Sequence, residues 1–394
     1  IQMNKADLEI INTLFKSKSS SNSSKKFYFI QNKDKTIRWI YPSSLKKPSF
    51  LAFYMVSNTR SKIISILTKI SFYLKVNKSI QIEIFEDSII NNIMKKFKNY
   101  DYSIFTGTAG INRKLLIELN QKATTKYFAK ISLTNTSENL IKNEAETLEY
   151  LGNLDLKDIS IPRIIDKNSN YIVIDNIKQD DSVQLNHLTN NHFKFLKSIY
   201  ESTFTNIKLK NLDFYHQITA NIRQLKSDFI NPKLDKNQIQ NMTKNLSECL
   251  NLLNLDEKVC VSLAHCDFTP WNIFVNQNNI SVIDWELSSK DVPILYDLFL
   301  FIFQTSILVE RLDYQTIKSL INKSLQNSII NESIKELNIN INQVYILYLT
   351  SIVSYYLNKY NHQEQLHTQS YWLINTWDEA LEDILNTKGK ALNE

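Results

Sequence analysis

The stretch Val261–Glu286 reads VSLAHCDFTPWNIFVNQNNISVIDWE, and it decides the fold that we predict for this chain. It opens with an apolar run of strand length. A loop follows that carries His265, Asp267 and Asn272, three residues whose side chains can hold protons or bind oxygen-loving cations. The spacing H-x-D-x-x-x-x-N is that of a phosphoryl-transfer catalytic loop. A polar loop between two strands, without catalysis, is the simpler alternative.

Two further β-rich runs follow this loop. Ile273–Val275 and Ile280–Ile283 are separated by four polar residues, which predicts a hairpin. The two ends of a hairpin lie side by side. We therefore expect Asn272, just before the first strand, to lie close to Asp284, just after the second.

This arrangement suits the transfer of a phosphoryl group. The transition state carries negative charge on the phosphoryl oxygens, so the protein supplies metal ligands and positioning. Mg²⁺ prefers hard oxygen ligands from one or two side chains, and Asn272 and Asp284 are such a pair. Asp267 is placed to accept a hydroxyl proton as the base. We expect His265 to brace the loop rather than to transfer protons.

The motifs HCDFTPWNIF and VIDWE resemble the catalytic segment of the aminoglycoside phosphotransferase and choline kinase superfamily. The resemblance implies a protein-kinase-like fold and the phosphorylation of small molecules. The usual loop of that superfamily has Gly where this chain has Cys266, and often Gly where it has Trp271. Neither substituted position is a metal ligand or a base, so these departures concern the shape of the loop and its contacts with substrate more than the chemistry.

The resemblance extends upstream to a region that would bind nucleotide. Ile104–Asn112 reads IFTGTAGIN, and Gly107 and Gly110 are two of only four glycines in the chain. Glycine lets the backbone approach phosphate closely and adopt positive φ. Two strands are expected to follow, and the second carries Lys130. This pattern resembles the phosphate loop of the superfamily and its strand lysine.

A helix with an apolar face is predicted over Glu138–Leu151. The resemblance places Glu144 where the helix glutamate of the superfamily pairs with the lysine, although Glu146 competes for this role. The segment from Asp175 to Ile177 resembles the hinge, whose backbone would hold the adenine of ATP (or GTP).

A carboxylate inside an apolar helix separates this chain from the protein kinases. Asp297 lies in the run ILYDLFLFIF, thirteen positions after Asp284. A buried carboxylate needs a partner, and the resemblance implies that Asp297 binds back to the catalytic loop. The short interval leaves no room for an activation segment and peptide platform, which favours a small-molecule acceptor over a protein.

The N-terminal region up to about residue 98 does not fit the kinase pattern. The segment 16–26 is Ser-rich and is predicted to be a loop, and two short strands are expected after it. Arg60–Lys75 has apolar residues at helical spacing with basic residues between them. We predict an amphipathic helix packed on a small α/β module. A basic helix lying on a membrane surface is the alternative.

The whole pattern predicts an α+β, bilobal protein-kinase-like fold. We expect an N-terminal α/β module over residues 1–98, a nucleotide-binding small lobe and hinge over 99–178, and a helical large lobe over 179–394. The net charge of +6 is a weak argument for nucleic acid, and we expect no such partner. Three cysteines and no apolar run of membrane-spanning length predict a soluble, cytoplasmic protein, although peripheral membrane contact is left open.

We therefore expect an ATP- and Mg²⁺-dependent phosphotransferase that acts on a small-molecule hydroxyl. The acceptor is a sugar or glycan intermediate, an amino alcohol such as choline, or an aminoglycoside. The sugar is slightly favoured, because the N-terminal region goes beyond a minimal drug-modifying enzyme. A catalytically inactive, kinase-like protein that binds nucleotide or a partner is the alternative. The sequence leaves the oligomeric state open.

Overall fold

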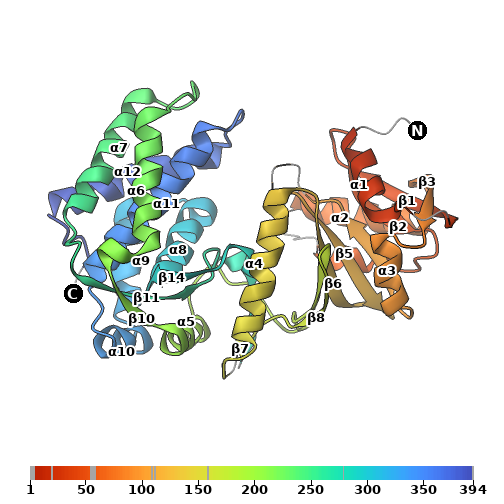
Figure 1. Cartoon of the computed structure of the whole chain (residues 1–394), viewed down its shortest axis with the longest axis horizontal. Helices are drawn as coiled ribbons and strands as arrows, with labels where there is room; N and C mark the ends of the chain where they lie inside the picture. The colour runs from red at the N-terminus through yellow and green to blue at the C-terminus, as the bar shows by residue number, and fades with distance from the viewer. Residues whose placement is uncertain are drawn as a thin grey trace. The chain divides into compact units, whose positions relative to one another are not determined.

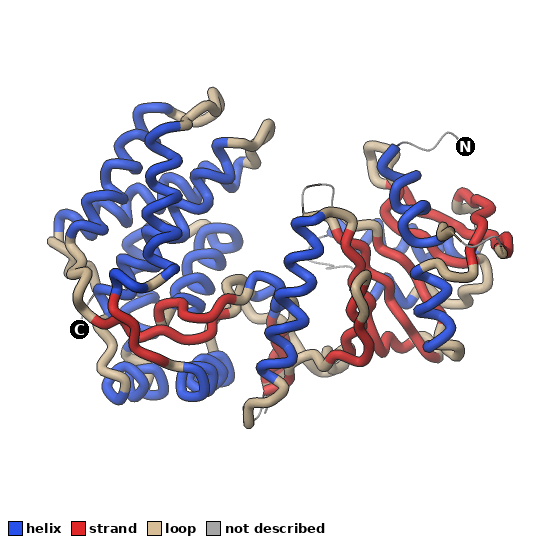
Figure 2. The backbone as a smooth tube through the Cα atoms, in the orientation of Figure 1, coloured by secondary structure: helices blue, strands red, loops and turns tan. Residues whose placement is uncertain are grey.

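The chain forms two compact units in the computed structural model. The first comprises Ile1–Gly152 and Pro162–Ile177, and the second Asn153–Ile161 and Lys178–Glu394. The first is rich in strands and the second in helices (Figure 2), which agrees with the α+β, bilobal class that the sequence predicts. The structure describes residues 5–18, 21–53, 59–107, 110, 112–157, 159–277 and 279–392.

The first unit is built on one eight-stranded sheet (Figure 1). The strand order is β3-β1-β2-β4-β5-β6-β9-β8, and helices complete the unit. The elements in chain order are α1 (Lys5–Phe15), β1 (Asn22–Gln31), β2 (Ile37–Pro42), the 3-10 helix η1 (Ser49–Phe53), α2 (Thr59–Tyr73), β3 (Lys78–Phe85), α3 (Ile89–Lys96), β4 (Asp101–Phe105), β5 (Lys114–Gln121), β6 (Thr124–Ser132), α4 (Asn135–Leu151), β8 (Ile164–Lys167) and β9 (Tyr171–Asp175).

The sheet runs without a break from the N-terminal strands β1, β2 and β3 into the strands from β4 onward. β2 pairs with β4 through Trp39 opposite Phe105 and Ile40 opposite Ile104. The boundary predicted between residues 98 and 99 therefore falls inside one sheet. The prediction of a loop over 16–26 is wrong for its last residues, because β1 begins at Asn22 and pairs with β3 from there.

Side chains on opposite faces of β1 and β2 enter two separate cores. Phe27 and Ile40 belong to the larger core, which also includes buried residues of α1 and α3. Trp39 and Tyr41 point to the other face, where they pack with Phe50 of η1 and with α2. The alternation of strand side chains thus lets one sheet bury apolar groups on both faces.

The second unit is a helical body with two small sheets. One sheet has the order β10-β11-β14 and the other β12-β13-β7. Its elements are β7 (Ile159–Ser160), α5 (Asn190–Thr203), β10 (Thr205–Lys208), the 3-10 helix η2 (Leu209–Asn211), α6 (Asp213–Ser227), α7 (Lys236–Asn251), β11 (Lys258–Ala264), the 3-10 helix η3 (Pro270–Asn272), β12 (Ile273–Val275), β13 (Ile280–Val282), the 3-10 helix η4 (Trp285–Leu287), β14 (Ser289–Pro293), α8 (Tyr296–Thr305), the π-helix η5 (Ser306–Glu310), α9 (Tyr314–Leu325), α10 (Ser328–Glu336), α11 (Ile341–Asn361) and α12 (Thr368–Asn386).

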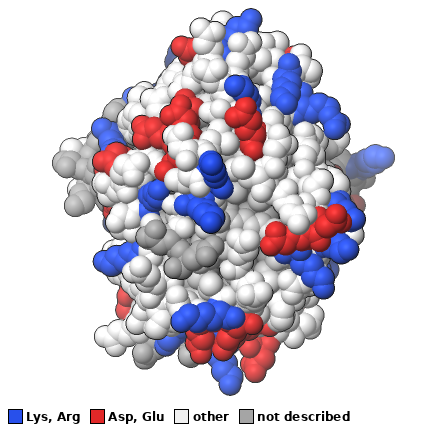
Figure 3. All heavy atoms as spheres, turned by 90° about the vertical axis from the view of Figure 1, so that its left-hand side faces the viewer, with Lys and Arg blue, Asp and Glu red and all other residues white. Residues whose placement is uncertain are grey.

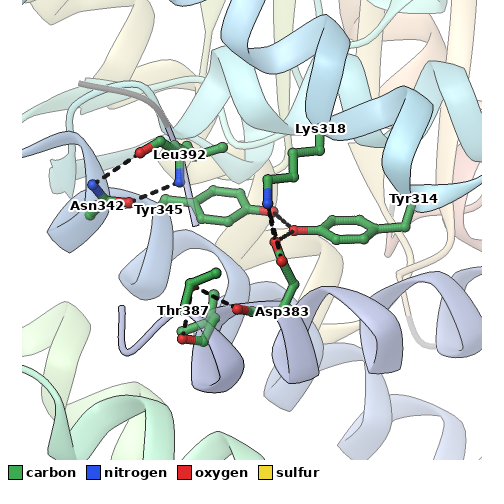
Figure 4. Close-up of polar contacts among 8 residues, drawn as sticks. Tyr314, Lys318, Asn342, Tyr345, Asp383, Thr387 and Leu392 are labelled. Atoms are coloured by element: carbon green, nitrogen blue, oxygen red, sulfur yellow. Dashed lines mark hydrogen bonds and ion pairs between the residues drawn. The ribbon is translucent and has the colours of Figure 1, made fainter. Parts of the chain in front are cut away.

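Helix α11 is buried over most of its length and packs against α6, α7, α8 and α12. A polar cluster ties it to its neighbours (Figure 4). Asp383 of α12 accepts hydrogen bonds from Tyr314 Oη at 2.7 Å and Lys318 Nζ at 2.8 Å, both on α9. Asn342 of α11 exchanges two hydrogen bonds with the backbone of Leu392. These contacts fix the last helix and the segment after it to the helical core.

Helix α2 forms where the sequence predicts a helix, but several of its apolar side chains do not pack as predicted. Ile66, Leu67 and Ile70 are all exposed, so the expectation that this face covers an α/β module is wrong for these residues. Among the described residues, no helix combines the length and apolar character that crossing a membrane requires.

Candidate active site

The predicted hairpin is present in the second unit. β12 and β13 pair in antiparallel register, with Ile273 opposite Val282 and Val275 opposite Ile280. At their open end, the backbone N–H of Ile283 donates to the carbonyl oxygen of Asn272 at 3.0 Å. Asn272 and the residue that follows Ile283, Asp284, are thus brought side by side at this end of the hairpin.

Asp267 and Asn272 are joined directly. Asn272 Nδ2 donates to Asp267 Oδ2 at 2.8 Å and to the backbone oxygen of Asp267 at 3.0 Å. Both donated bonds use the amide nitrogen, so the amide oxygen is the end of Asn272 that can act as a ligand. Asn272 is 6% exposed, and its position is therefore fixed before any ligand arrives.

His265 holds the loop to the hairpin. Its ring Nε2 lies 2.9 Å from the carbonyl oxygen of Ile283, and its Nδ1 accepts the backbone N–H of Asp267 at 3.2 Å. The two contacts together select the neutral tautomer with the proton on Nε2. The side chain is buried. This geometry is that of a brace, because both ring nitrogens are engaged by backbone.

Asp297 binds back to the catalytic loop, as the resemblance implies. Its carboxylate accepts the backbone N–H of His265 at 2.7 Å and that of Cys266 at 3.0 Å. Hydrogen bonds to a charged group contribute about 1.5–3 kcal/mol each. They offset the cost of burying the carboxylate in α8, although burial still raises the pKa of Asp297 to about 7. Cys266 has φ +60, a conformation that explains why glycine is usual at this position.

Aromatic side chains pack around the loop that carries His265 and Asp267. The Phe268 ring stacks on Phe195 of α5, with centroids 5.1 Å apart. The Trp285 ring lies 4.6 Å from the ring of His265, and its indole N–H donates to the backbone of Val282. Phe268 and Trp285 are fully buried. A packed aromatic layer makes the loop rigid, which a preorganised catalytic site requires.

Burial, and to a smaller extent neighbouring carboxylates, raise the pKa of Asp267. Burial raises it to about 7, although the hydrogen bond from Asn272 acts in the opposite direction. The negative charges of Asp284, Glu286 and Asp297 add to the increase. A general base works best when its pKa lies near the operating pH. A cation bound nearby would lower this pKa again.

The end of the hairpin has the donor set that Mg²⁺ prefers. The amide oxygen of Asn272 and the carboxylate of Asp284 are hard oxygen ligands. The carboxylate oxygens of Asp284 and Glu286 lie within 4.8 Å of each other. Two acidic groups held this close repel each other unless a cation lies near them. Sequence reasoning missed Glu286, and its position two residues after Asp284 was the available signal.

In the first unit, Lys130 and Glu144 form a buried ion pair. Lys130 Nζ lies 2.6 Å from Glu144 Oε1 and 2.7 Å from Oε2. Lys130 is on β6, and Glu144 is fully buried on α4, which packs against β6. Glu146 instead faces solvent and pairs with Lys142 on the same helix. The structure thus separates the two glutamates that the sequence could not rank securely.

The glycine-rich turn lies between β4 and β5. Gly107 has φ +73 and Gly110 has φ +150, both in the region that favours glycine. A Cβ on Gly107 would lie 2.2 Å from the carbonyl oxygen of Lys114. The described part of the turn is held by Arg113, whose Nε donates to the carbonyl of Thr106. Residues 108, 109 and 111 of the predicted phosphate loop lie outside the described residues.

We expect Gly107→Ala to distort this turn and to weaken nucleotide binding. The clash and the positive φ together should cost about 1–3 kcal/mol of stability. Melting temperature and nucleotide affinity would be measured together. Gly389→Ala is the control, since Gly389 has a similar φ of +83 but an added Cβ would meet nothing nearer than 3.6 Å. Unchanged nucleotide affinity in the Gly107 variant would remove this turn from the nucleotide site.

The predicted hinge lies where the chain leaves the first unit, which ends at Ile177. Asp175 closes β9, and its carboxylate accepts hydrogen bonds from the backbone and from Nε of Arg163. The backbone N–H of Asn176 bonds to the carbonyl of Lys126 on β6. The side chain of Asp175 therefore serves the fold.

The aromatic residues near the C-terminus divide into two groups. Trp377 is fully buried and Trp372 lies under Arg311, 4.3 Å from the ring centroid to the guanidinium carbon. Tyr356 is different. Burial raises its pKa, and the negative charge of Asp267 raises it further, so the phenol lies within electrostatic reach of the catalytic loop.

These features, a braced acidic loop and an oxygen-rich hairpin end, are typical of a phosphotransferase type of site. The model of the phosphotransferase enzyme family matches residues 211–318, about a quarter of the chain, and this segment includes the whole catalytic loop. The resemblance to the aminoglycoside phosphotransferase and choline kinase superfamily is thereby confirmed. No curated relative matches the sequence.

Solved structures of similar fold include three kinds of small-molecule kinase. An aminoglycoside phosphotransferase with ADP bound is 15% identical, with a TM-score of 0.48, over 74% of this chain and 97% of that chain. A choline kinase from Streptococcus pneumoniae is 16% identical, with a TM-score of 0.48, over 75% and 98%. An ethanolamine kinase from Plasmodium vivax is 15% identical, with a TM-score of 0.46, over 84% and 91%.

Proposed function

We propose that this chain is an ATP- and Mg²⁺-dependent phosphotransferase that phosphorylates a hydroxyl group of a small molecule. The observation that carries the proposal is the catalytic loop. Asp267 is bonded to Asn272, the loop is braced by His265 and Asp297, and Asp284 lies at the adjoining end of the hairpin.

Each residue of the loop has one part in this proposal. Asp267 accepts the proton of the acceptor hydroxyl, because its carboxylate is buried and has a raised pKa. Asn272 and Asp284 hold Mg²⁺, which when bound neutralises charge on the phosphates. His265 positions the loop and takes no proton, since its ring nitrogens are engaged by backbone.

The residues of the first unit would bind the nucleotide. Lys130, oriented by Glu144, contacts phosphate oxygens, and the turn with Gly107 and Gly110 offers backbone N–H groups to phosphate. The backbone of the Asp175–Ile177 segment holds the adenine. ATP is the nucleotide that we propose, and GTP serves as the competitor in the test.

The acceptor that we favour is a sugar or glycan intermediate. Tyr356 lies within electrostatic reach of Asp267. An aromatic side chain in this region suits the apolar face of a sugar ring, but it also suits the cation of an amino alcohol or an aminoglycoside. The three classes therefore enter one experiment, in which ATP consumption is measured with sugars, amino alcohols and aminoglycosides. Binding of nucleotide without transfer to any acceptor would favour an inactive, kinase-like binding protein.

Asp284→Ala should weaken Mg²⁺-dependent ATP binding by at least about tenfold, since even groups that only support metal ligands matter to that degree. Calorimetry with Mg²⁺ and with EDTA would separate the metal-dependent part. The control is Asp291→Ala, because Asp284 and Asp291 both have positive φ, +66 and +57, and the backbone cost is then matched. Equal Mg²⁺-ATP affinity in the two variants would exclude Asp284 as a ligand.

A further inference from the structure

Helix α2 of the first unit presents an apolar face to solvent. Six apolar side chains share it at helical spacing, and each is between 49% and 66% exposed. Exposed apolar residues are ordinary when scattered, but a contiguous patch marks an interaction surface. The six are Ile63, Ile66, Leu67, Ile70 and Tyr73 of α2 and Leu74, which directly follows the helix.

The orientation of this helix is set by its opposite side. Phe72 is buried and contacts Tyr41 and Phe50, with ring centroids 5.2 and 6.4 Å apart. Ser65 is also buried. Because Phe72 anchors one side of the helix in the aromatic core, the apolar face on the other side is held outward.

The chain around α2 has an unusual charge. From Lys35 to Ile82 there are nine Lys and Arg residues and no Asp or Glu. The whole chain has 46 basic and 40 acidic residues, so the remaining residues are net negative. Lys69, Lys75 and Lys78 are exposed on or near the helix. On the side of the molecule shown in Figure 3, by contrast, basic and acidic side chains are interspersed.

We propose that α2 lies on an anionic lipid surface, with its apolar face in the interface and the surrounding lysines on the headgroups. A helix with an apolar face and basic surroundings binds membranes in this way. Lysine and arginine close to an anionic bilayer are attracted to it. The proposal concerns a surface helix, in keeping with the absence of a membrane-crossing helix among the described residues.

The positive charge around α2 favours an anionic lipid surface, rather than a second copy of this chain, as the partner of the apolar face. Two copies joined through α2 would bring the exposed Lys69, Lys75 and Lys78 of each copy towards one another, and like charges oppose association. An anionic bilayer instead complements these charges and covers the apolar face at once.

The experiment is co-sedimentation of the full chain with phosphatidylcholine vesicles, with and without about one third phosphatidylglycerol. The protein should bind the anionic vesicles, and the binding should weaken at high salt. The variant Ile66→Gln/Leu67→Gln/Ile70→Gln should bind them at least about tenfold more weakly. The matched control is Ile230→Gln/Leu252→Gln/Leu255→Gln, three exposed apolar residues of the other unit, and it should bind like the wild type.

A second variant tests the charge without touching the apolar face. Lys69→Glu/Lys75→Glu should also lose binding to anionic vesicles, while nucleotide binding stays unchanged in every variant. Equal binding by the wild type and the apolar variant would overturn the proposal, as would equal binding to neutral and anionic vesicles. A concentration-dependent dimer that the apolar variant abolishes, without vesicle binding, would assign the face to a second copy instead.

Discussion

Replacing Asp267 by Asn should lower turnover by about 10²–10⁴-fold, the usual contribution of a positioned general base. The amide has nearly the size of the carboxylate but cannot take a proton. Its oxygen can still accept the bond that Asn272 Nδ2 now donates at 2.8 Å. The loop should therefore keep its shape, and nucleotide affinity should stay near that of the wild type, because Asp267 is not assigned to the metal.

Single-turnover transfer and nucleotide binding would be measured in parallel on the same protein. Asp256→Asn is the control, since Asp256 is an exposed residue of the same unit that pairs with Lys210. The melting temperature should not fall in the Asp267 variant, because the substitution removes a buried charge. Near-normal turnover would show that Asp267 is not the base.

Lys130→Met should abolish transfer, and the structure adds an expectation about stability. The substitution leaves Glu144 buried without its cation, and breaking one partner of a buried ion pair costs about 3–5 kcal/mol. The single variant will therefore lose both activity and stability. On its own it does not separate a phosphate-binding lysine from a structural one.

The double variant Lys130→Met/Glu144→Leu makes the separation. Replacing a buried ion pair by apolar side chains of similar volume is often neutral or stabilising. We expect the melting temperature to return towards that of the wild type, while nucleotide affinity and transfer remain low. Recovery of activity together with stability would identify Lys130 as a structural residue, with no part in binding phosphate.

The parts of the fold that were predicted most accurately are those determined by residues close together in the sequence. The hairpin strands Ile273–Val275 and Ile280–Val282 appear within one residue of their predicted ends. A polar turn joins them, so local chemistry decides the pairing. The pairing of β2 with β4 could not be predicted in this way, because 58 intervening residues separate Pro42 from Asp101 and nothing in their sequences specifies the partner.

The sequence also could not predict which side chains would be buried and which would be exposed. The spacing of Ile66 and Ile70 correctly predicted a helix. Periodicity does not tell, however, whether the apolar face of that helix packs against the rest of the protein or is exposed to solvent. Likewise, Asn22 to Lys26 are polar and exposed, and they form a strand only because β3 pairs with their backbone. Long-range contacts decide both outcomes.

The catalytic loop was easier to predict, because its residues are close in sequence and their spacing follows from chemistry. The sequence could not show that Asp297 would bond to two backbone N–H groups, or that both nitrogens of His265 would be engaged. Those contacts depend on how α8 and the hairpin pack around the loop.

The pairing of β2 with β4 also decides how this protein can be cut. A truncation at residue 98 would remove β1, β2 and β3 and leave β4 as an open edge strand with unpaired backbone groups along Ile104 and Phe105. Exposed edges of this kind recruit other strands and promote aggregation. The N-terminal strands therefore cover this edge of the sheet, so a shorter version of the protein would need a new edge designed into β4.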